Sequence, residues 1–171
     1  MKLALIFSTI LLMALIPDSA VLAADKKGAT IGPSGNPLPR FVAISGKLAN
    51  MRTGPGLQYP ITWVYKRPAL PMEIIDEHGP WRRVRDSQGT EGWMHVKLFF
   101  PSKRFAIIRG KTRTLYKEKD RTSPILLTAE AGVTGELLEC EGIWCRVNIE
   151  GRKAWVERRH LWGVYKNEAF D

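Results

Sequence analysis

The fold of this chain is decided by the stretch Asn50-Met51-Arg52-Thr53-Gly54-Pro55-Gly56. In it, a short alternation of polar and apolar residues runs into Thr-Gly-Pro-Gly. Glycine and proline so close together interrupt a helix and make the backbone turn. Two further segments follow in order, Trp81-Arg82-Arg83-Val84 and Gly92-Trp93-Met94-His95-Val96. Their β-branched and aromatic residues predict short strands joined by tight turns.

The segments around this stretch also have the composition of strands. We expect strands at 41–44, 61–65, 72–75, 81–85 and 90–94, because each is rich in Val, Ile, Trp or Tyr and bounded by Pro or Gly. No segment shows a sustained helical period, so the sequence predicts an all-β barrel or sandwich. Trp81 and Val84 are three residues apart, a spacing that strict alternation does not place on one face. Either a bulge intervenes or one of the two lies on the surface.

The second half of the chain repeats the first weakly. Trp81-Arg82-Arg83-Val84 recurs as Trp144-Cys145-Arg146-Val147, and Gly92-Trp93-Met94 recurs as Ala154-Trp155-Val156. Leu98 aligns less closely with Leu161. These matches indicate a tandem duplication. We call residues 40–101 copy one and residues 102–171 copy two.

The opening of copy two differs from that of copy one. Arg113-Thr114-Leu115-Tyr116-Lys117 stands where copy one has residues 50–54, so the turn glycines are absent. The chain closes with Leu161-Trp162-Gly163-Val164-Tyr165, whose aromatic side chains we expect to dock on a barrel.

The order of these motifs resembles the bacterial SH3-like (SH3b) domain over residues 46–98. In that family, N-V-R-x-G-P-G is followed by W-x-x-V and by a G-x-x-G-W-V strand that ends at a short helical turn. The whole of 40–166 resembles exported alphaproteobacterial proteins that carry two such copies and end in L-W-G-V-Y. The resemblance implies two small SH3-like antiparallel β-barrels in tandem. The motif residues in this chain are Asn50, Arg52, Gly54, Pro55 and Gly56.

The N-terminus has the pattern of a secretory signal peptide. Lys2 precedes fourteen uncharged residues, 3–16, which are too few to span a hydrocarbon core of about 30 Å as a helix. Small residues near Ala23 provide a cleavage site. We predict a signal peptide at 1–23, a periplasmic or secreted protein, and no membrane span after cleavage; the alternative is an uncleaved anchor helix. Residues 24–39 are rich in Gly and Pro, which predicts a disordered linker.

The composition and motifs argue against several functions. The formal charge of +9 is compatible with nucleic-acid binding, but predicted export argues against such a partner. No phosphate-binding or dinucleotide fingerprint is present. The two repeats leave no residues for a separate catalytic domain, and His95 and His160 follow the last strand of each copy. The sequence therefore predicts neither an enzyme nor a bound cofactor.

The two cysteines, Cys140 and Cys145, are separated by four residues. If those four form a hairpin loop, the cysteines lie opposite each other and should pair in an oxidising compartment. A zinc site would need two further ligands from the three histidines, and the spacing is not C-x-x-C. The sequence predicts a disulfide and no metal.

Copy one carries more aromatic residues than a barrel of sixty residues needs for its core. Aromatic-lined grooves hold extended peptides in other small β-domains. For each Trp the competing interpretation is core packing, and for the nearby cations it is a solvated surface. The candidate ligand-binding residues are Tyr59, Trp63, Tyr65, Trp81, Arg82 and Trp93.

The compartment and the resemblance favour peptidoglycan or its stem peptide as the partner. The alternative is an envelope protein that presents a short extended or Pro-rich segment, or a scaffold in which the two copies pack within a complex. We expect copy one to bind, because copy two has the flexible, charged Lys117-Glu118-Lys119-Asp120 in place of the glycine turn.

We predict that mass spectrometry of the periplasmic protein finds an N-terminus at Ala24 or Asp25, because the small-residue site follows the apolar run directly. An intact Met1 in the membrane fraction would contradict export with cleavage.

Overall fold

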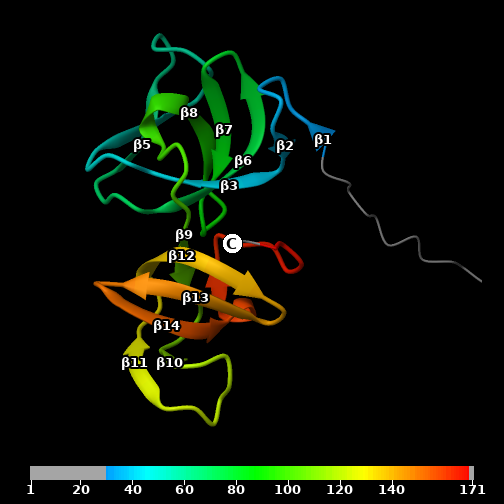
Figure 1. The fold of residues 1–171 in the computed structure, drawn as a ribbon. Coiled ribbons are helices and arrows are strands. Elements are labelled where there is room, and N and C mark those ends of the chain that lie inside the picture. Colours follow the sequence, from blue (N-terminus) through cyan, green and yellow to red (C-terminus); the bar gives the residue numbers. More distant parts are fainter. Residues whose placement is uncertain (1–29, 170–171) are drawn as a thin grey trace, which may run out of the picture.

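The structure is a computed structural model that describes residues 30–169 (Figure 1). It consists of strands, two 3-10 turns and loops, so the predicted all-β class is confirmed. The expected signal peptide at 1–23 and the first part of the expected linker, 24–29, lie outside the described residues. Over the described part of the chain, no helix is long and apolar enough to cross a membrane.

Each copy forms one antiparallel sheet with its own core. In copy one the strand order is β3-β6-β7-β8-β4-β5, and in copy two it is β11-β10-β14-β13-β12-β9-β15. The first sheet contains β3 (Arg40–Ala43), β4 (Ala49–Arg52), β5 (Ile61–Tyr65), β6 (Pro71–His78), β7 (Trp81–Arg85) and β8 (Glu91–His95), followed by the 3-10 turn η1 (Val96–Leu98). The second contains β9 (Phe105–Ile108), β10 (Arg113–Tyr116), β11 (Ile125–Ala129), β12 (Thr134–Glu141), β13 (Trp144–Ile149) and β14 (Arg152–Glu157), then η2 (Arg158–His160) and β15 (Leu161–Trp162).

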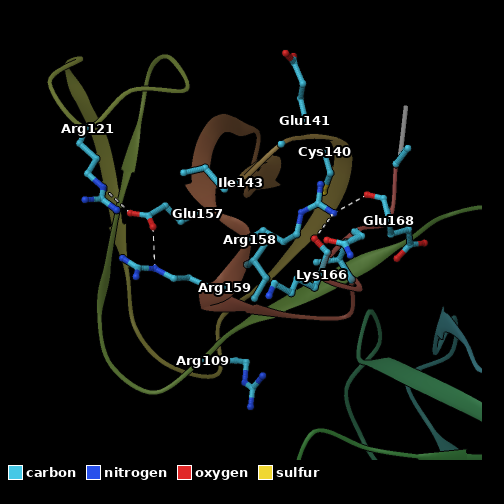
Figure 2. A pocket seen from close by; sticks show the side chains of 15 residues that line it. Arg109, Arg121, Cys140, Glu141, Ile143, Glu157, Arg158, Arg159, Lys166 and Glu168 are labelled. Carbon is cyan, nitrogen blue, oxygen red and sulfur yellow. Dashed lines mark hydrogen bonds and ion pairs between the residues drawn. The ribbon is translucent and has the colours of Figure 1, made fainter. Parts of the chain in front are cut away.

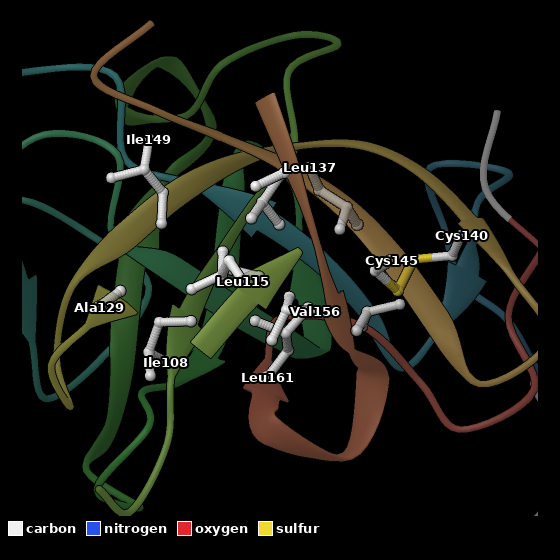
Figure 3. Close-up of a cluster of buried hydrophobic side chains, with 13 residues drawn as sticks. Ile108, Leu115, Ala129, Leu137, Cys140, Cys145, Ile149, Val156 and Leu161 are labelled. Carbon is white, nitrogen blue, oxygen red and sulfur yellow. A yellow bond between two sulfur atoms is a disulfide. The ribbon is translucent and has the colours of Figure 1, made fainter. Parts of the chain in front are cut away.

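The cores follow from the alternation of side chains along the strands. Residues i and i+2 share one face of a strand, so one apolar set from each strand is buried. In copy one this set includes Met51, Val84 and Met94, and in copy two it includes Leu115, Val147 and Val156 at the corresponding places. Figure 3 shows the copy-two cluster, with Leu115 and Val156 labelled.

The duplication is real, but two of its predicted alignments are wrong by one residue. The pairing register shifts after Met51 in copy one and after Leu115 in copy two, so these two buried residues are equivalent. Each 3-10 turn is followed directly by a buried apolar residue, Phe99 in copy one and Leu161 in copy two, which makes Phe99, not Leu98, the counterpart of Leu161. Loop lengths differ between the copies, and only the strand pairing fixes the correct offset.

The spacing of Trp81 and Val84 has a simple explanation. β7 pairs with β8 without a register shift, and the bulge lies on β6, between Ile74 and Asp76. Val84 therefore points into the core while Trp81 lies on the other face of the sheet. Trp81 is nevertheless buried, with its ring 5.3 Å from that of His95 in an edge-on contact.

The expectation of a disordered linker is wrong for residues 30–39. There β1 (Thr30–Ile31) pairs with β2 (Pro37–Leu38) in a small hairpin. Ser34 donates from its backbone N–H and its hydroxyl to the carboxylate of Glu77, both at 2.8 Å. The Gly- and Pro-rich sequence that predicted disorder forms the tight turn of this hairpin, and a buried carboxylate holds the turn in place.

The predicted disulfide is present. Cys140 and Cys145 face each other across the β12–β13 hairpin, and their sulfur atoms are bonded. In copy one the same paired position, at the same point of the β6–β7 hairpin, is occupied by Glu77 and Arg82. An ion pair in one copy thus takes the place of a disulfide in the other.

The two copies pack against each other through the end of the chain. The ring of Phe41 in copy one lies 5.1 Å from that of Trp162 and 4.6 Å from that of Tyr165. The Tyr165 hydroxyl donates to Glu73 at 3.0 Å. Figure 1 shows this red C-terminal segment between the two sheets. The predicted docking of the closing aromatics is confirmed, and their partner is the other copy.

We predict that Phe41→Ala lowers the free energy of unfolding by about 3 kcal/mol, because it leaves a cavity beneath Trp162 and Tyr165. Urea denaturation measures this loss. Leu57→Ala is the control, since Leu57 is exposed and should change stability by less than about 0.5 kcal/mol. Similar stabilities of the two variants would mean that the copies are not coupled through Phe41.

Candidate functional site

The glycine turn of copy one positions an exposed tyrosine. Arg52 donates from Nη1 to the carbonyl oxygens of Leu57 and Tyr59, at 3.1 and 2.7 Å, and so closes the loop between β4 and β5. The ring of Tyr59 lies against Gly54, where a Cβ would come within 2.5 Å of the ring. Arg52 and Gly54 of the predicted motif therefore shape this loop. Asn50 lies half-buried in β4, and Pro55 and Gly56 complete the turn.

β5 is an outer strand of its sheet and presents apolar side chains to solvent. Among residues 30–169 it pairs only with β4, which leaves its other backbone edge open within this part of the chain. Its first four residues are exposed, and Trp63 has 54% of its surface accessible. Tyr59, just before the strand, is 39% exposed. A shallow hollow of about 290 Å³ lies over residues 61–64. We call this surface, Tyr59 with residues 61–64, the β5 edge.

Three of the six candidate ligand residues are interior, which corrects the sequence-based assignment. Tyr65 belongs to the core, and its hydroxyl donates to Asp86 at 2.9 Å; burial and this contact raise the pKa of the phenol. Trp81 and Arg82 are each only 8% exposed. Trp93 is half-buried on the outer face of the sheet, paired with Arg52 and Arg83. Tyr59 and Trp63 alone are widely accessible.

Arg82 is buried as the ion-pair partner of a buried carboxylate, Glu77. Its Nε lies 3.2 Å from Glu77 Oε1, and Arg40 donates to the same oxygen at 2.5 Å. Burial alone would raise the pKa of Glu77. Hydrogen bonds from Arg40 and Ser34, with the charge of Arg40, outweigh it and lower the pKa to about 2. This cluster is structural, and Arg82 is not available to a ligand.

Copy two contains a cavity of about 960 Å³ that the sequence analysis missed (Figure 2). Its walls are the loop after β9, the loop before β11, the tip of the β12–β13 hairpin, η2, and β15 with the residues after it. The signal in the sequence is the basic run Arg158-Arg159-His160 in a copy that also holds both cysteines. We call this pocket the copy-two cavity. Its lining residues include Arg109, Arg121, Ile143, Glu157, Arg158, Arg159 and Lys166.

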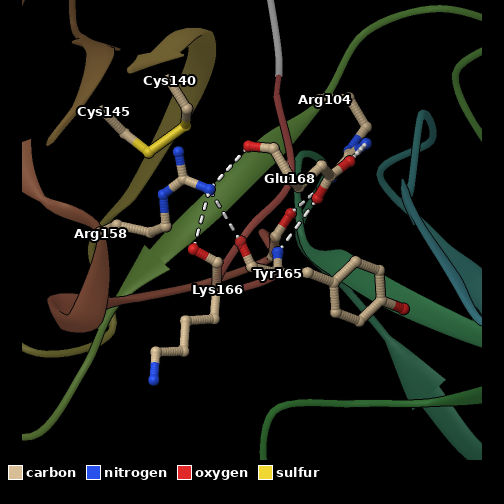
Figure 4. Close-up of a disulfide and its surroundings, with 8 residues drawn as sticks. Arg104, Cys140, Cys145, Arg158, Tyr165, Lys166 and Glu168 are labelled. Atoms are coloured by element: carbon tan, nitrogen blue, oxygen red, sulfur yellow. Dashed lines mark hydrogen bonds and ion pairs between the residues drawn. A yellow bond between two sulfur atoms is a disulfide. The ribbon is translucent and has the colours of Figure 1, made fainter. Parts of the chain in front are cut away.

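Arg158 builds one wall of this cavity. Its side chain is buried, and Nη1 donates to the carbonyl oxygens of Tyr165, Lys166 and Glu168 at 3.0, 3.1 and 2.6 Å (Figure 4). These bonds fold the segment after β15 back beside the disulfide. Arg104 fixes the same segment through an ion pair with Glu168 at 2.8 Å.

The carboxylate at the rim of the cavity is neutralised within the protein. Glu157 lies 2.7 Å from Arg121 Nε and 2.8 Å from Arg159 Nε. The hydrogen bond from Arg121 lowers the pKa of Glu157 despite burial, which acts in the other direction. Glu157 therefore stays ionised, and its charge is shared by two cations. Within residues 30–169, no group of three His, Cys, Asp or Glu side chains is placed to hold a metal ion.

A family model described as "Bacterial SH3 domain" matches this chain twice, at residues 45–98 and 110–163. The chain belongs to the bacterial SH3 domain family. The SH3-like resemblance is thus confirmed for both copies, including the divergent second one. The β1–β2 hairpin and the segment after Gly163 lie outside the matched residues, so each bacterial SH3 domain of this chain has an additional segment packed against it.

Comparison with solved structures gives distant similarities. They include NlpC2 from Trichomonas vaginalis (13% identity, 77% of this chain, 51% of that chain, TM-score 0.36), NlpC1 from the same organism (14%, 78%, 48%, 0.34) and an NlpC/P60 family protein from Bacillus cereus ATCC 10987 (15%, 71%, 55%, 0.33). The chain spans about half the length of each of these proteins. Such TM-scores support no statement about function. No curated protein matches the chain.

The Glu77 cluster predicts a specific acid sensitivity of the first bacterial SH3 domain. Because the folded-state pKa of about 2 lies below the ordinary 4.5, its stabilisation is complete above about pH 5 and is lost as the pH falls toward 2. We expect a loss of about 3 kcal/mol from this group. Urea denaturation at several pH values should show this loss in the wild type, and Glu77→Gln should lack it.

The matched control is Glu118→Gln, at an exposed carboxylate in copy two, which should keep the acid sensitivity. If Glu77→Gln retained the wild-type dependence on pH, the depressed pKa would belong to another group.

Proposed function

We propose that this protein is a non-catalytic binding module of the cell envelope that recognises peptidoglycan through its stem peptide. The observation that carries the proposal is the β5 edge, a strand edge that the described residues leave unpaired, with an exposed Trp63 beside Tyr59. The proposal includes a periplasmic or secreted location, which rests on the signal-peptide pattern of residues 1–23.

An open strand edge suits an extended peptide. Unpaired backbone N–H and C=O groups along β5 can pair with those of a ligand, which supplies affinity without regard to its side chains. The exposed indole of Trp63 offers rigid apolar area, which loses little conformational entropy on binding. A stem peptide is short and extended, and therefore fits such an edge.

The charge next to the β5 edge suits the carboxylates of a stem peptide. Lys66 follows β5 directly, is exposed and has no ion-pair partner among residues 30–169. Its ammonium group can bind a carboxylate by a charge-assisted hydrogen bond. Arg67, the next residue, is already engaged with the carbonyl of Gly132 at 3.0 Å. Lys66 is therefore the cation that we assign to the ligand.

Copy two is a poorer candidate for this mode of binding. Its corresponding outer strand, β11, exposes Ile125 and Leu126, but no aromatic residue lies in the strand or in the loop before it. That loop carries charged side chains where copy one has the glycine turn. Copy two thus lacks the fixed aromatic area of the β5 edge.

We propose a non-catalytic role because the two bacterial SH3 domains account for most of the chain. The two domains occupy 45–98 and 110–163, and both cysteines are bonded to each other. A nucleophilic mechanism needs an activated nucleophile beside a base. The geometry described above supplies binding surfaces, and catalysis by this protein is not proposed.

A protein partner is the second candidate, because backbone pairing at the β5 edge accepts any extended chain. An envelope protein with a short extended or Pro-rich segment would use the same unpaired groups and the same Trp63.

We predict that Trp63→Ala weakens binding to purified sacculi at least about tenfold, or about 1.4 kcal/mol, in a sedimentation assay. The change removes stacking area, and Trp63 is exposed, so the melting temperature should stay at the wild-type value. Leu126→Ala, on the equivalent outer strand of copy two, is the matched control and should sediment like the wild type.

Two outcomes would redirect the proposal. Sedimentation unaffected by Trp63→Ala would remove the β5 edge as the site. No sedimentation of the wild type, with retention of one envelope protein that Trp63→Ala releases, would favour the protein partner.

A further inference from the structure

We infer that the copy-two cavity is a second binding site, separate from the β5 edge, for an acidic peptide segment with an apolar side chain next to its carboxylate. The inference does not rest on the function proposed above, because it uses residues of copy two alone. Its basis is a buried cation that the described residues leave without a counterion.

The size and lining of the cavity fit a short peptide segment. Ligand sites commonly occupy about 300–1,000 Å³ and combine an apolar lining with a few polar groups. The copy-two cavity, at about 960 Å³, lies at the upper end of that range. Its apolar part includes Ile143, Leu161, Val164 and Cys140 of the disulfide. Ile143 is 63% exposed at the hairpin tip, where an apolar ligand group would cover it.

Among residues 30–169, the acidic groups that line the cavity are Glu141, Glu157 and Glu168, and each of them is engaged within the protein. Glu157 is paired with Arg121 and Arg159. Glu141 is paired with Lys119, and Glu168 with Arg104. These carboxylates therefore leave the other cations of the cavity uncompensated.

Two exposed cations at the cavity remain available. Among residues 30–169, the guanidinium of Arg109 and the ammonium of Lys166 have no ion-pair or hydrogen-bond partner. They lie on different segments, before β10 and after β15, and both line the cavity. Flexible cations at a rim attract an anionic ligand before it is seated.

Arg158 is the decisive residue. Only 7% of the surface of Arg158 is exposed. Among the described residues its partners are all neutral, namely the carbonyl oxygens bound by Nη1. Nε is buried without a partner. Nη2 makes no hydrogen bond with the described residues and points toward the disulfide in Figure 4. A buried charge without a counterion is costly, and a ligand carboxylate at this wall would reduce that cost.

In copy one the buried arginine has a counterion within the protein. There Arg82 is buried to the same degree, but Glu77 faces it as a counterion, and the β1–β2 hairpin covers the pair. The residue at the position of Arg158 in copy one is Val96, which carries no charge. Copy two has thus gained a buried cation and has a disulfide where copy one has the carboxylate.

The test uses the full mature chain and a defined probe, N-acetyl-Leu-Glu-Leu with a free C-terminal carboxylate, in isothermal titration calorimetry. Arg109→Gln with Lys166→Gln should weaken binding at least about fivefold, as expected for two lost charge contacts. The matched control is Arg152→Gln with Lys153→Gln. This control removes the same charge from two exposed residues beside the β13–β14 turn, whereas the cavity residue Glu157 lies at the other end of β14. It should change affinity less than about twofold.

Two further measurements separate site binding from general charge attraction. The C-terminal amide of the same peptide, with Gln for Glu, should bind at least about tenfold more weakly. Ile143→Ser should weaken the acid probe without lowering the melting temperature, since Ile143 is exposed.

The inference is overturned if the probe shows no saturable binding, or if the two double variants weaken it equally. Trp63→Ala should leave probe binding unchanged. A loss in that variant would place the probe at the β5 edge and also overturn the inference. Because sacculus binding is measured separately, failure of the second site and failure of the proposed function remain distinguishable.

Discussion

The structure depends on one paired position near the tip of each long hairpin. In copy one it holds Glu77 opposite Arg82, and in copy two it holds Cys140 opposite Cys145. A buried ion pair is stable only when further hydrogen bonds satisfy its charges, and Ser34 and Arg40 supply them. The disulfide has no such requirement. Copy one therefore needs further hydrogen-bond donors around this position, and copy two does not.

The segments outside the two family domains follow from that difference. The β1–β2 hairpin covers the charged pair of copy one, and both members of the pair are buried. In copy two the segment after β15 is held by Arg158 at a short distance from the disulfide, and a cavity remains between them. The same fold thus presents an apolar strand edge in one copy and a cationic cavity in the other.

The packing of the copies joins these surfaces into one body. Phe41 lies beneath Trp162 and Tyr165, and the Tyr165 hydroxyl bonds to Glu73 of copy one. Burial and the charge of Glu73 raise the pKa of this tyrosine, so it stays a donor throughout the physiological range. The segment that forms a wall of the cavity is therefore the one that connects the copies.

The sequence by itself determined the strand composition, the tandem SH3-like repeat, the disulfide and the shape of the Gly54 turn. These features depend on local propensity, spacing and pattern, which are read along the chain. Only the tertiary structure decided which aromatic residues are exposed, because burial depends on what packs against a strand from elsewhere. Tyr65 and Trp63 lie two residues apart in one strand, yet one is in the core and the other is in solvent. Tertiary structure also ordered residues 30–39, buried Arg82 with a carboxylate and gave Arg158 no carboxylate partner among residues 30–169, since ion pairs form between residues brought together by the fold and not by their spacing.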